Sequence, residues 1–137
     1  MNRIKFDSEL MKLITLFESV TGASVKDCIA DGKIIFIIDE GEMGKAIGKN
    51  GANIKRVENM LKKRVRLVEF SNDVVQFVKN LVYPIDAMEI KQEENAIIIH
   101  GRDTGSKAML IGRERQNINH LAVIVKRYFD VKEIKVV

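Results

Sequence analysis

The chain of 137 residues carries 23 Lys and Arg against 19 Asp and Glu, and 46% of its residues are hydrophobic. With nine Gly, one Pro and one Cys, this composition excludes a collagen, a disordered tail and a disulfide scaffold, and predicts one ordinary domain or two very small ones. Apolar runs such as 34–38 are too short to cross a membrane, and the first ten residues lack the apolar core of a signal peptide, so we expect a cytoplasmic protein without a membrane partner.

The first half of the chain predicts six elements. Apolar residues at helical spacing from Leu10 to Phe17 indicate a helix, and two extended runs joined by Asp31-Gly32 indicate a β-hairpin, because glycine readily takes positive φ in such a turn. Asp39 is expected to cap a short helix. The expected elements are, in order, a helix capped at Asp7 or Ser8, strands over 25–30 and 33–38, a short helix over about 42–47, a longer helix over about 52–62 and a strand over 65–70.

The second half repeats the first at a spacing of 64 residues. Eight of the 21 pairs between Ile34/Ile98 and Ile54/Ile118 are identical, where ordinary composition supplies about one or two. The apolar stripes recur as well, so we expect the same elements in the same order. They are a helix capped at Ser71 or Asn72, strands over 88–93 and 96–99 around Glu94-Asn95, helices over about 106–111 and 116–128, and a strand over 131–136.

Basic charge gathers in two segments at matching places in the repeat. Residues 41–66 hold eight Lys and Arg with two Glu, and residues 102–127 hold six Lys and Arg with one Asp and one Glu. Since the whole chain has a net charge of +4, the rest of it is net negative. Such segments are typical of a solvated helix face as well as of a surface that binds a polyanion. The motif inside them is needed to choose between these two interpretations.

A glycine loop joins the two central helices of the first half. In Gly48-Lys49-Asn50-Gly51 the missing Cβ of each glycine allows a sharp turn and a close approach by a phosphodiester. The helix that follows presents unpaired N–H groups and the positive end of its dipole, and Lys49 adds charge at the tip. An isolated GxxG is more often a helix C-cap followed by a turn. Here, however, the loop follows a hairpin, lies among basic residues and recurs in the second half.

The segment IGKNGANI, Ile47 to Ile54, in this setting resembles the KH domain, and the order α-β-β-α-α-β resembles its type II form. Two abutting units that fill the chain are similar to the short archaeal type of the NusA family of transcription elongation and termination factors. The resemblance implies an α+β fold of tandem type II KH domains, KH domain 1 over 1–70 and KH domain 2 over 71–137, each with a three-stranded mixed sheet packed against helices. It also implies that the loop clamps the backbone of single-stranded RNA.

The second loop departs from the family pattern. It reads GRER over 112–115, so Arg115 stands where the first loop has its second glycine, and Glu114 would repel a phosphate at the tip. Two interpretations stay open. In one, this unit is mainly a structural partner. In the other, which the likeness to second KH units of the NusA family favours slightly, the loop binds RNA through Gly112, Arg113, Arg115, Gln116 and Asn117.

The resemblance assigns RNA contact in the first unit to the glycine loop and its neighbours. These candidate RNA-binding residues are Lys45, Ile47, Gly48, Lys49, Asn50, Gly51, Asn53, Ile54, Lys55 and Arg56. The bases would lie in a groove beside the helix that follows the loop. Val57 would complete that groove, with Phe36 and Ile38 of the hairpin as weaker candidates. A stripe at helical spacing is usually buried, however, so most of these groove residues are expected in the core.

The sequence gives little support for a catalytic site. His100 and His120 have no histidine counterpart in the repeat, and Cys28 is most simply a small core residue. We therefore expect no enzyme, no metal and no cofactor. The expected partner is single-stranded RNA, with RNA polymerase or other transcription machinery as a further candidate, and the chain is expected to be a monomer. The alternatives are a protein-interaction module that docks on RNA polymerase or the ribosome, and a ribosome-associated RNA-binding protein.

Overall fold

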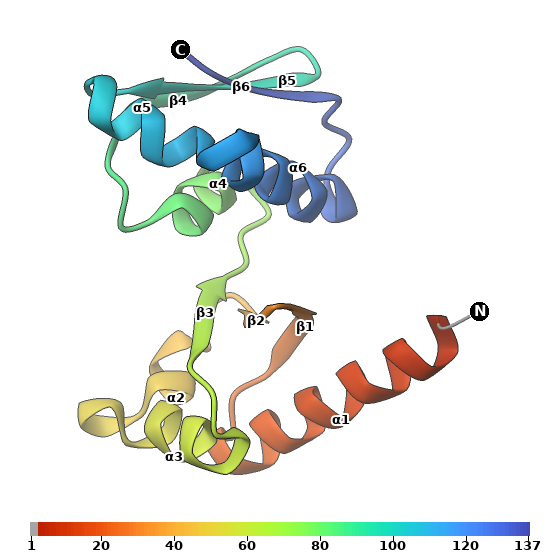
Figure 1. Cartoon of the computed structure of the whole chain (residues 1–137). Coiled ribbons are helices and arrows are strands. Elements are labelled where there is room, and N and C mark those ends of the chain that lie inside the picture. The colour runs from red at the N-terminus through yellow and green to blue at the C-terminus, as the bar shows by residue number, and fades with distance from the viewer. Residues whose placement is uncertain (1–2) are drawn as a thin grey trace. The chain divides into compact units, whose positions relative to one another are not determined.

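The structure, a computed structural model, describes the backbone of residues 3–137 and the side chains of residues 8–30 and 32–137 (Figure 1). The chain divides into two compact units, which are called unit 1 (residues 1–70) and unit 2 (residues 71–137). Each unit has its own helices and its own sheet.

Unit 1 contains a three-stranded sheet in the order β1-β2-β3, with β1 antiparallel and β3 parallel to the central strand β2. The central strand has the sequence KIIFII, whose β-branched residues suit a pleated and buried position. The elements are α1 (Arg3–Thr21), β1 (Val25–Asp31), β2 (Lys33–Ile38), α2 (Met43–Ile47), the 3₁₀ turn η1 (Lys49–Gly51), α3 (Ala52–Leu61) and β3 (Val65–Glu69).

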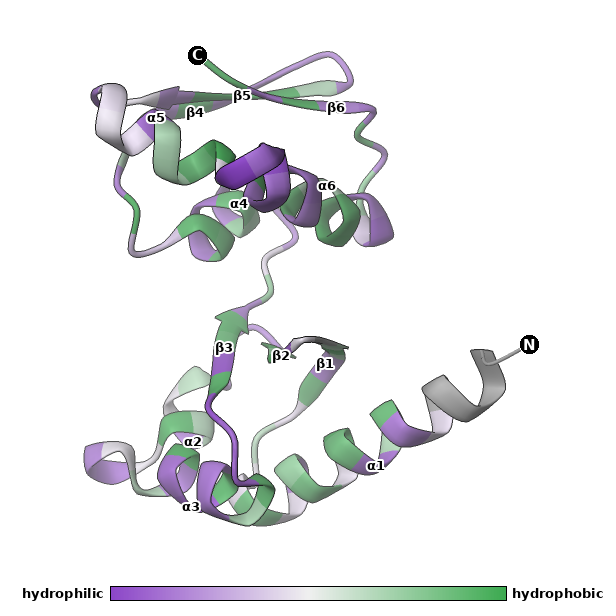
Figure 2. Cartoon of the chain, viewed as in Figure 1, coloured by the Kyte–Doolittle hydropathy of each residue, from purple (hydrophilic) through white to green (hydrophobic). Residues whose placement is uncertain are grey.

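Unit 2 has the same order and the same sheet topology, β4-β5-β6, again with one antiparallel and one parallel pair. Its helices lie on one face of its sheet (Figure 1), and hydrophobic residues recur along both the helices and the strands (Figure 2). Phe77 and Val78 of α4 and Ile97 and Ile99 of β5 are fully buried. The elements are α4 (Val74–Val82), β4 (Ala87–Glu93), β5 (Ala96–Gly101), α5 (Thr104–Ile111), the 3₁₀ turn η2 (Arg113–Arg115), α6 (Gln116–Tyr128) and β6 (Glu133–Val136).

The expected α+β fold with a three-stranded mixed sheet in each half is confirmed, but three expected helix caps are wrong. Helix α1 begins at Arg3, because no Gly or Pro interrupts the residues before Asp7 and Ser8. Helix α4 is capped by Asp73, whose carboxylate accepts from the Val75 amide, rather than by Ser71 or Asn72. Asp103 does cap α5, accepting from the Ser106 amide at 2.7 Å, and this hydrogen bond lowers the pKa of its carboxyl.

The third wrong cap is Asp39, the counterpart of Asp103 in the repeat. Its carboxylate accepts a hydrogen bond from the Ser24 hydroxyl, and α2 begins only at Met43, after a turn that ends at Glu42. The same residue type at the same repeat position therefore has two roles, because α2 is shorter than α5 by one turn at its start.

The core of unit 1 contains residues that the sequence had suggested for a binding groove. Phe36 packs on Phe17 of α1 with ring centroids 4.3 Å apart, and Phe36, Ile38 and Val57 are all 0% exposed. Alternate residues of β2 share one face of the sheet, and that face packs against the helices. The expectation that most of the suggested groove residues belong to the core is therefore confirmed for these three, which do not line an RNA groove.

Cys28 lies in the same core, and burial together with the Asp27 carboxylate raises the pKa of its thiol to about 12. At pH 8 the thiol of the folded protein is neutral, whereas about a tenth is thiolate in an unfolded chain, because an unperturbed thiol has a pKa near 8.5–9. We expect iodoacetamide to label Cys28 at least about tenfold faster in urea than in buffer. Mass spectrometry of samples taken over time measures the rate of labelling. Equal rates would contradict this placement of the thiol.

Candidate nucleic-acid interface

The glycine loop of unit 1 connects α2 to α3 through an unusual backbone path. Gly48 has φ 76° and ψ 172°, a conformation that only glycine adopts without strain, and Gly51 has φ 76° and ψ 16°. Asn50 between them is also left-handed, at φ 56°, which asparagine tolerates better than most residues. Three of the four loop residues therefore have positive φ, and the chain reverses within one turn of 3₁₀ helix.

A side-chain hydrogen bond holds this loop closed. The amide nitrogen of Asn53, in the first turn of α3, donates to the backbone carbonyl of Lys45 in α2 at 2.8 Å. The Asn53 side chain lies against Gly48 so closely that a Cβ on Gly48 would come within 2.7 Å of its Cγ. Gly48 is thus required twice, once for its backbone angles and once for the room that Asn53 needs.

The loop leaves two backbone N–H groups available at its tip. Gly48 donates to the Gly44 carbonyl, Gly51 to the Gly48 carbonyl and Ala52 to the Lys49 carbonyl. Among the described residues, no acceptor pairs with the N–H groups of Lys49 and Asn50. Adjacent unpaired N–H groups at a turn attract an anion, so these two are the strongest donors that the loop can offer.

The loop of unit 2 has nearly the same conformation despite its different sequence. Gly112 has φ 77° and ψ 169°, Glu114 has φ 55° and Arg115 has φ 63° and ψ 20°. The same side-chain hydrogen bond recurs, from Asn117 to the Met109 carbonyl at 2.7 Å. Its N–H pairing is also the same and leaves the N–H groups of residues 113 and 114 available among the described residues.

The two loops differ in strain and charge instead. Left-handed backbone costs a residue with a Cβ about 1–2 kcal/mol, and unit 2 bears this cost at both Glu114 and Arg115. Unit 1 has Asn50 and Gly51 at these positions, which adopt the conformation at less cost. The side chains of Glu114 and Arg115 are both exposed, so the tip of this strongly hydrophilic turn carries a carboxylate and a guanidinium on consecutive residues (Figure 2).

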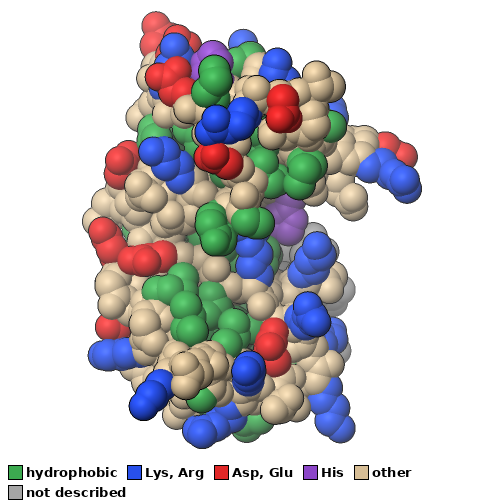
Figure 3. Space-filling view, turned by 90° about the vertical axis from the view of Figure 1, so that its left-hand side faces the viewer, with side chains coloured by type: hydrophobic (Ala, Val, Ile, Leu, Met, Phe, Trp, Pro, Cys, Tyr) green, Lys and Arg blue, Asp and Glu red, His purple; other side chains and the backbone are tan. Residues whose placement is uncertain are grey.

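None of the fifteen candidate residues is buried. The charged ones, with Asn50, Gln116 and Asn117, are exposed, Ile47 is 40% exposed, and Gly48, Gly51, Asn53, Ile54 and Gly112 are half-buried. Lys45 forms an exposed ion pair with Glu42 at 3.4 Å. On unit 1, Figure 3 shows Lys and Arg side chains around a patch of hydrophobic ones. The structure thus brings the ten candidates of unit 1 together around one loop, and the five of unit 2 around the other.

Two features of these sites go beyond the sequence interpretation. Asn53 and Asn117, expected to contact RNA, use their amide nitrogens to close the loops, and their shared place five residues after the first glycine was the available signal. The basic run Lys62 to Arg64 follows the far end of α3, a helix of ten residues and about 15 Å, so it does not join the loop.

We expect Asn53→Ala to destabilise unit 1 by about 1 kcal/mol, because the Lys45 carbonyl loses the hydrogen bond from the Asn53 side chain. Asn117→Ala should cost unit 2 about as much, since its hydrogen bond has the same geometry. Urea unfolding followed by circular dichroism measures both. If neither variant lowered the midpoint, the side-chain hydrogen bond would not hold the loop.

Among the described residues, no group of three or more His, Cys, Asp or Glu side chains is placed to hold a metal ion. No helix in the same part of the chain has both the length and the hydropathy that a membrane span requires.

Comparison with known families adds independent information. A family model described as "KH domain" matches residues 13–83, which is more than half of the chain. The match starts within α1 and ends just after α4, so it includes the glycine loop of unit 1.

Similarity to individual proteins extends over both units. The chain is 38% identical to the "Probable transcription termination protein NusA" of Methanococcus vannielii over 98% of this chain and 80% of that protein. It is 34% identical to the protein of the same name from Halococcus morrhuae, over 97% of this chain and 98% of that protein. A solved structure described as "Crystal structure of APE1850" matches with a TM-score of 0.72 and 28% identity, over 94% of this chain and 98% of that one.

Proposed function

Because the chain belongs to the KH domain family and, along its whole length, to the family named "Probable transcription termination protein NusA", we propose that it is a single-stranded RNA-binding transcription factor. In this proposal it binds nascent RNA and acts on transcription elongation or termination. RNA polymerase or another part of the transcription machinery is the class of protein partner that goes with this role.

The observation that carries the proposal is the glycine loop of unit 1. Its two available N–H groups, at Lys49 and Asn50, lie at an exposed tip, and the basic side chains of Lys45, Lys49, Lys55 and Arg56 are exposed around it. A phosphodiester oxygen fits such donors, because it needs N–H groups and positive charge but no fixed side-chain geometry. The bases are then free to be recognised on the neighbouring surface of α3.

The proposal includes two RNA-binding units of type II KH form. KH domain 1 spans 1–70 with a complete GxxG loop, and KH domain 2 spans 71–137 with the degenerate loop. The common element order, the matching loop angles and the repeated Asn hydrogen bond support this assignment. Two weak sites on one chain raise the effective concentration of RNA at the second site once the first is filled.

A salt titration tests the proposal as a whole. Binding of a random-sequence pool of short single-stranded RNA is measured by fluorescence anisotropy at increasing KCl. Each phosphate that the protein neutralises should contribute about −0.7 to the slope of log K against log salt. A slope near zero, or tighter binding to duplex than to single-stranded RNA, would contradict the proposal.

The second loop offers a gain-of-affinity prediction. Glu114→Asn removes a negative charge from the tip and places at φ 55° a residue that tolerates this conformation. We expect RNA to bind about three- to tenfold more tightly, since the available N–H groups of this loop then face no carboxylate. The measurement is the same anisotropy titration at low salt.

Glu94→Asn is the matched control for this variant. Glu94 is also an exposed glutamate of unit 2 in left-handed backbone, at φ 54°, but it lies in the turn between β4 and β5. Glu94→Asn should stabilise unit 2 by about as much as Glu114→Asn does, because both relieve left-handed backbone, but it should leave RNA affinity unchanged. Equal affinity gains for both variants would point to net charge alone and remove the second loop from the RNA site.

A further inference from the structure

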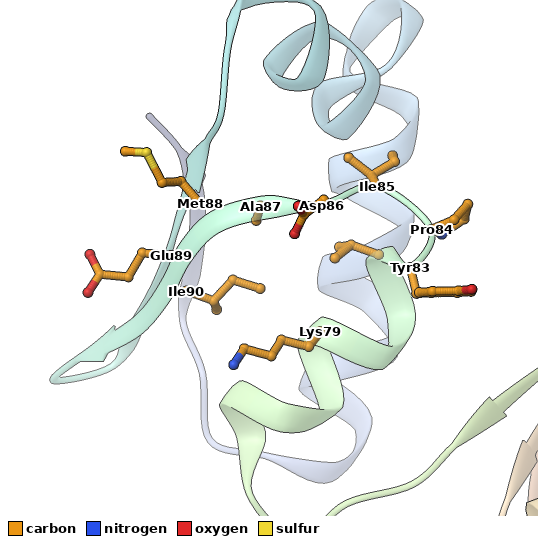
Figure 4. A pocket seen from close by; sticks show the side chains of 10 residues that line it. Lys79, Tyr83, Pro84, Ile85, Asp86, Ala87, Met88, Glu89 and Ile90 are labelled. Atoms are coloured by element: carbon orange, nitrogen blue, oxygen red, sulfur yellow. The ribbon is translucent and has the colours of Figure 1, made fainter.

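Unit 2 contains a groove that the glycine loops do not explain. It has a volume of about 500 Å³ and lies between the end of α4, the turn that follows it and the first half of β4 (Figure 4). Most of its lining is apolar, including Val82, Ile85 and Ile90, and the charged residues Lys79, Asp86 and Glu89 also border it. In Figure 4, Ile90 points from β4 toward α4 and Lys79 extends from α4 toward the strand. A volume of this size accommodates one or two side chains.

The strand that borders this groove is the edge of its sheet. In the part of the chain that the structure describes, β4 pairs with β5 alone, so the N–H and C=O groups along its outer side have no strand partner. The strand is seven residues long, Ala87–Glu93, and contains no proline. An edge strand with a helix beside it and an apolar groove between them is the arrangement by which several domains bind an extended peptide as an added strand.

The charge of this strand differs from that of the glycine loops. Glu89, Glu93 and Glu94 are exposed, and among the described residues their carboxylates form no ion pair. Asp86 is paired with Arg102 at 2.8 Å, and Lys91 is the one exposed base on the strand. A net negative edge repels phosphates, so this surface does not suit RNA.

The edge strand of unit 1 has acidic residues at the matching places. β1 and β4 are both seven residues long and share the same register shift, so Asp27 and Asp31 of β1 correspond to Glu89 and Glu93 of β4. Acidic residues on the edge strand therefore recur in both units, and the groove described above distinguishes the edge of unit 2.

We propose that the outer edge of β4 and the adjoining groove bind an extended, basic segment of a partner protein, which adds to the sheet as a further strand. Glu89 and Glu93 are four residues apart on one face of β4, so the segment carries Lys or Arg at positions i and i+4. The residue opposite Ile90, on the other face, is apolar and enters the groove. Main-chain hydrogen bonds supply affinity, and the two ion pairs with the apolar anchor supply specificity.

Phage display against the full chain tests this proposal. The expected result is enrichment of random twelve-residue peptides that share two basic residues four positions apart, with an apolar residue next to one of them. A synthetic peptide of the enriched sequence should bind at least tenfold more weakly to Glu89→Lys/Glu93→Lys. Asp130→Lys/Glu133→Lys, a reversal of two exposed charges elsewhere on unit 2, is the matched control and should bind normally. Failure to enrich such peptides, or equal losses in both variants, would overturn the proposal.

A backbone-modified peptide separates strand addition from charge attraction. Alternate N-methylation keeps the side chains and the charge of the peptide but removes the N–H groups that pair with an edge strand. The methylated peptide should lose binding, and undiminished binding would overturn strand addition. The peptide should bind Lys49→Asp/Asn50→Asp as well as it binds the unaltered chain, because the glycine loop takes no part. Displacement of the peptide by single-stranded RNA would assign this edge to RNA and contradict the proposal, whatever the outcome for the loops.

Discussion

Changing Lys49 and Asn50 together to aspartate is expected to weaken single-stranded RNA binding about 100-fold, or about 2.8 kcal/mol. The change replaces a cation by an anion and adds a second carboxylate beside the two N–H groups that are available to a phosphate. Two unit charges about 4 Å apart near a protein surface interact by about 4 kcal/mol, so a reversal of sign is large enough to produce this loss. Both side chains are exposed, so circular dichroism should stay unchanged.

The control for this variant carries the same change of net charge elsewhere on unit 1. Lys12 and Thr15 are exposed on α1, and Lys12→Asp/Thr15→Asp changes the charge by the same amount. RNA affinity should fall by less than about threefold, because these charges lie on α1 and not beside the available N–H groups of the loop, and salt screens longer-range interactions. Similar losses in the two variants would mean that net charge, and not the loop, governs binding.

Gly48→Ala is expected to have the second largest effect, on both stability and binding. The new Cβ would come within 2.7 Å of Asn53 Cγ, and the residue would have to keep φ 76° and ψ 172°. We expect a loss of about 1–3 kcal/mol in the free energy of unfolding, and about tenfold weaker RNA binding because the available N–H groups are displaced. Urea unfolding and the anisotropy titration measure the two effects.

Three other glycines separate the causes of this loss. Gly112→Ala creates the same contact in unit 2, at 2.6 Å, and should cost similar stability while leaving the loop of unit 1 intact. Gly51→Ala meets nothing closer than 3.8 Å, so its cost comes from positive φ alone. Gly44→Ala, within α2 and with open space around its Cβ, should be neutral or stabilising. A Gly44→Ala variant as unstable as Gly48→Ala would contradict the role given to Asn53.

The element order was predictable because each element has a local signal that the repeat shows twice. The apolar stripe of α6 and the run of β-branched residues in β2 are examples, and α6 matches its predicted bounds, 116–128. Capping was less predictable, since Asp39 and Asp103 occupy equivalent positions but have different hydrogen-bond partners. The choice depends on Ser24, which is distant in the sequence and becomes a neighbour only when β1 pairs with β2.

The glycine loop of unit 1 was found from its sequence, and the repeat predicted a loop at the same place in unit 2. There Arg115 adopts the left-handed conformation that Gly51 has in unit 1, and Asn117 ties the start of α6 to the end of α5. Local propensity is here overruled by one tertiary hydrogen bond and the tight contact at Gly112. The burial of Phe36 and Ile38 follows from the packing of α1 on β2, in agreement with the expectation that most of the suggested groove residues are core.

An NMR titration examines the phosphate-binding tip itself. The ¹⁵N-labelled chain is mixed with increasing amounts of the short single-stranded RNA pool, and backbone amide shifts are followed residue by residue. The amides of Lys49 and Asn50 should move first and furthest in unit 1, while that of Cys28 in the core stays in place. If RNA bound while the Lys49 and Asn50 amides stayed unmoved, the glycine loop would not be the site of backbone recognition.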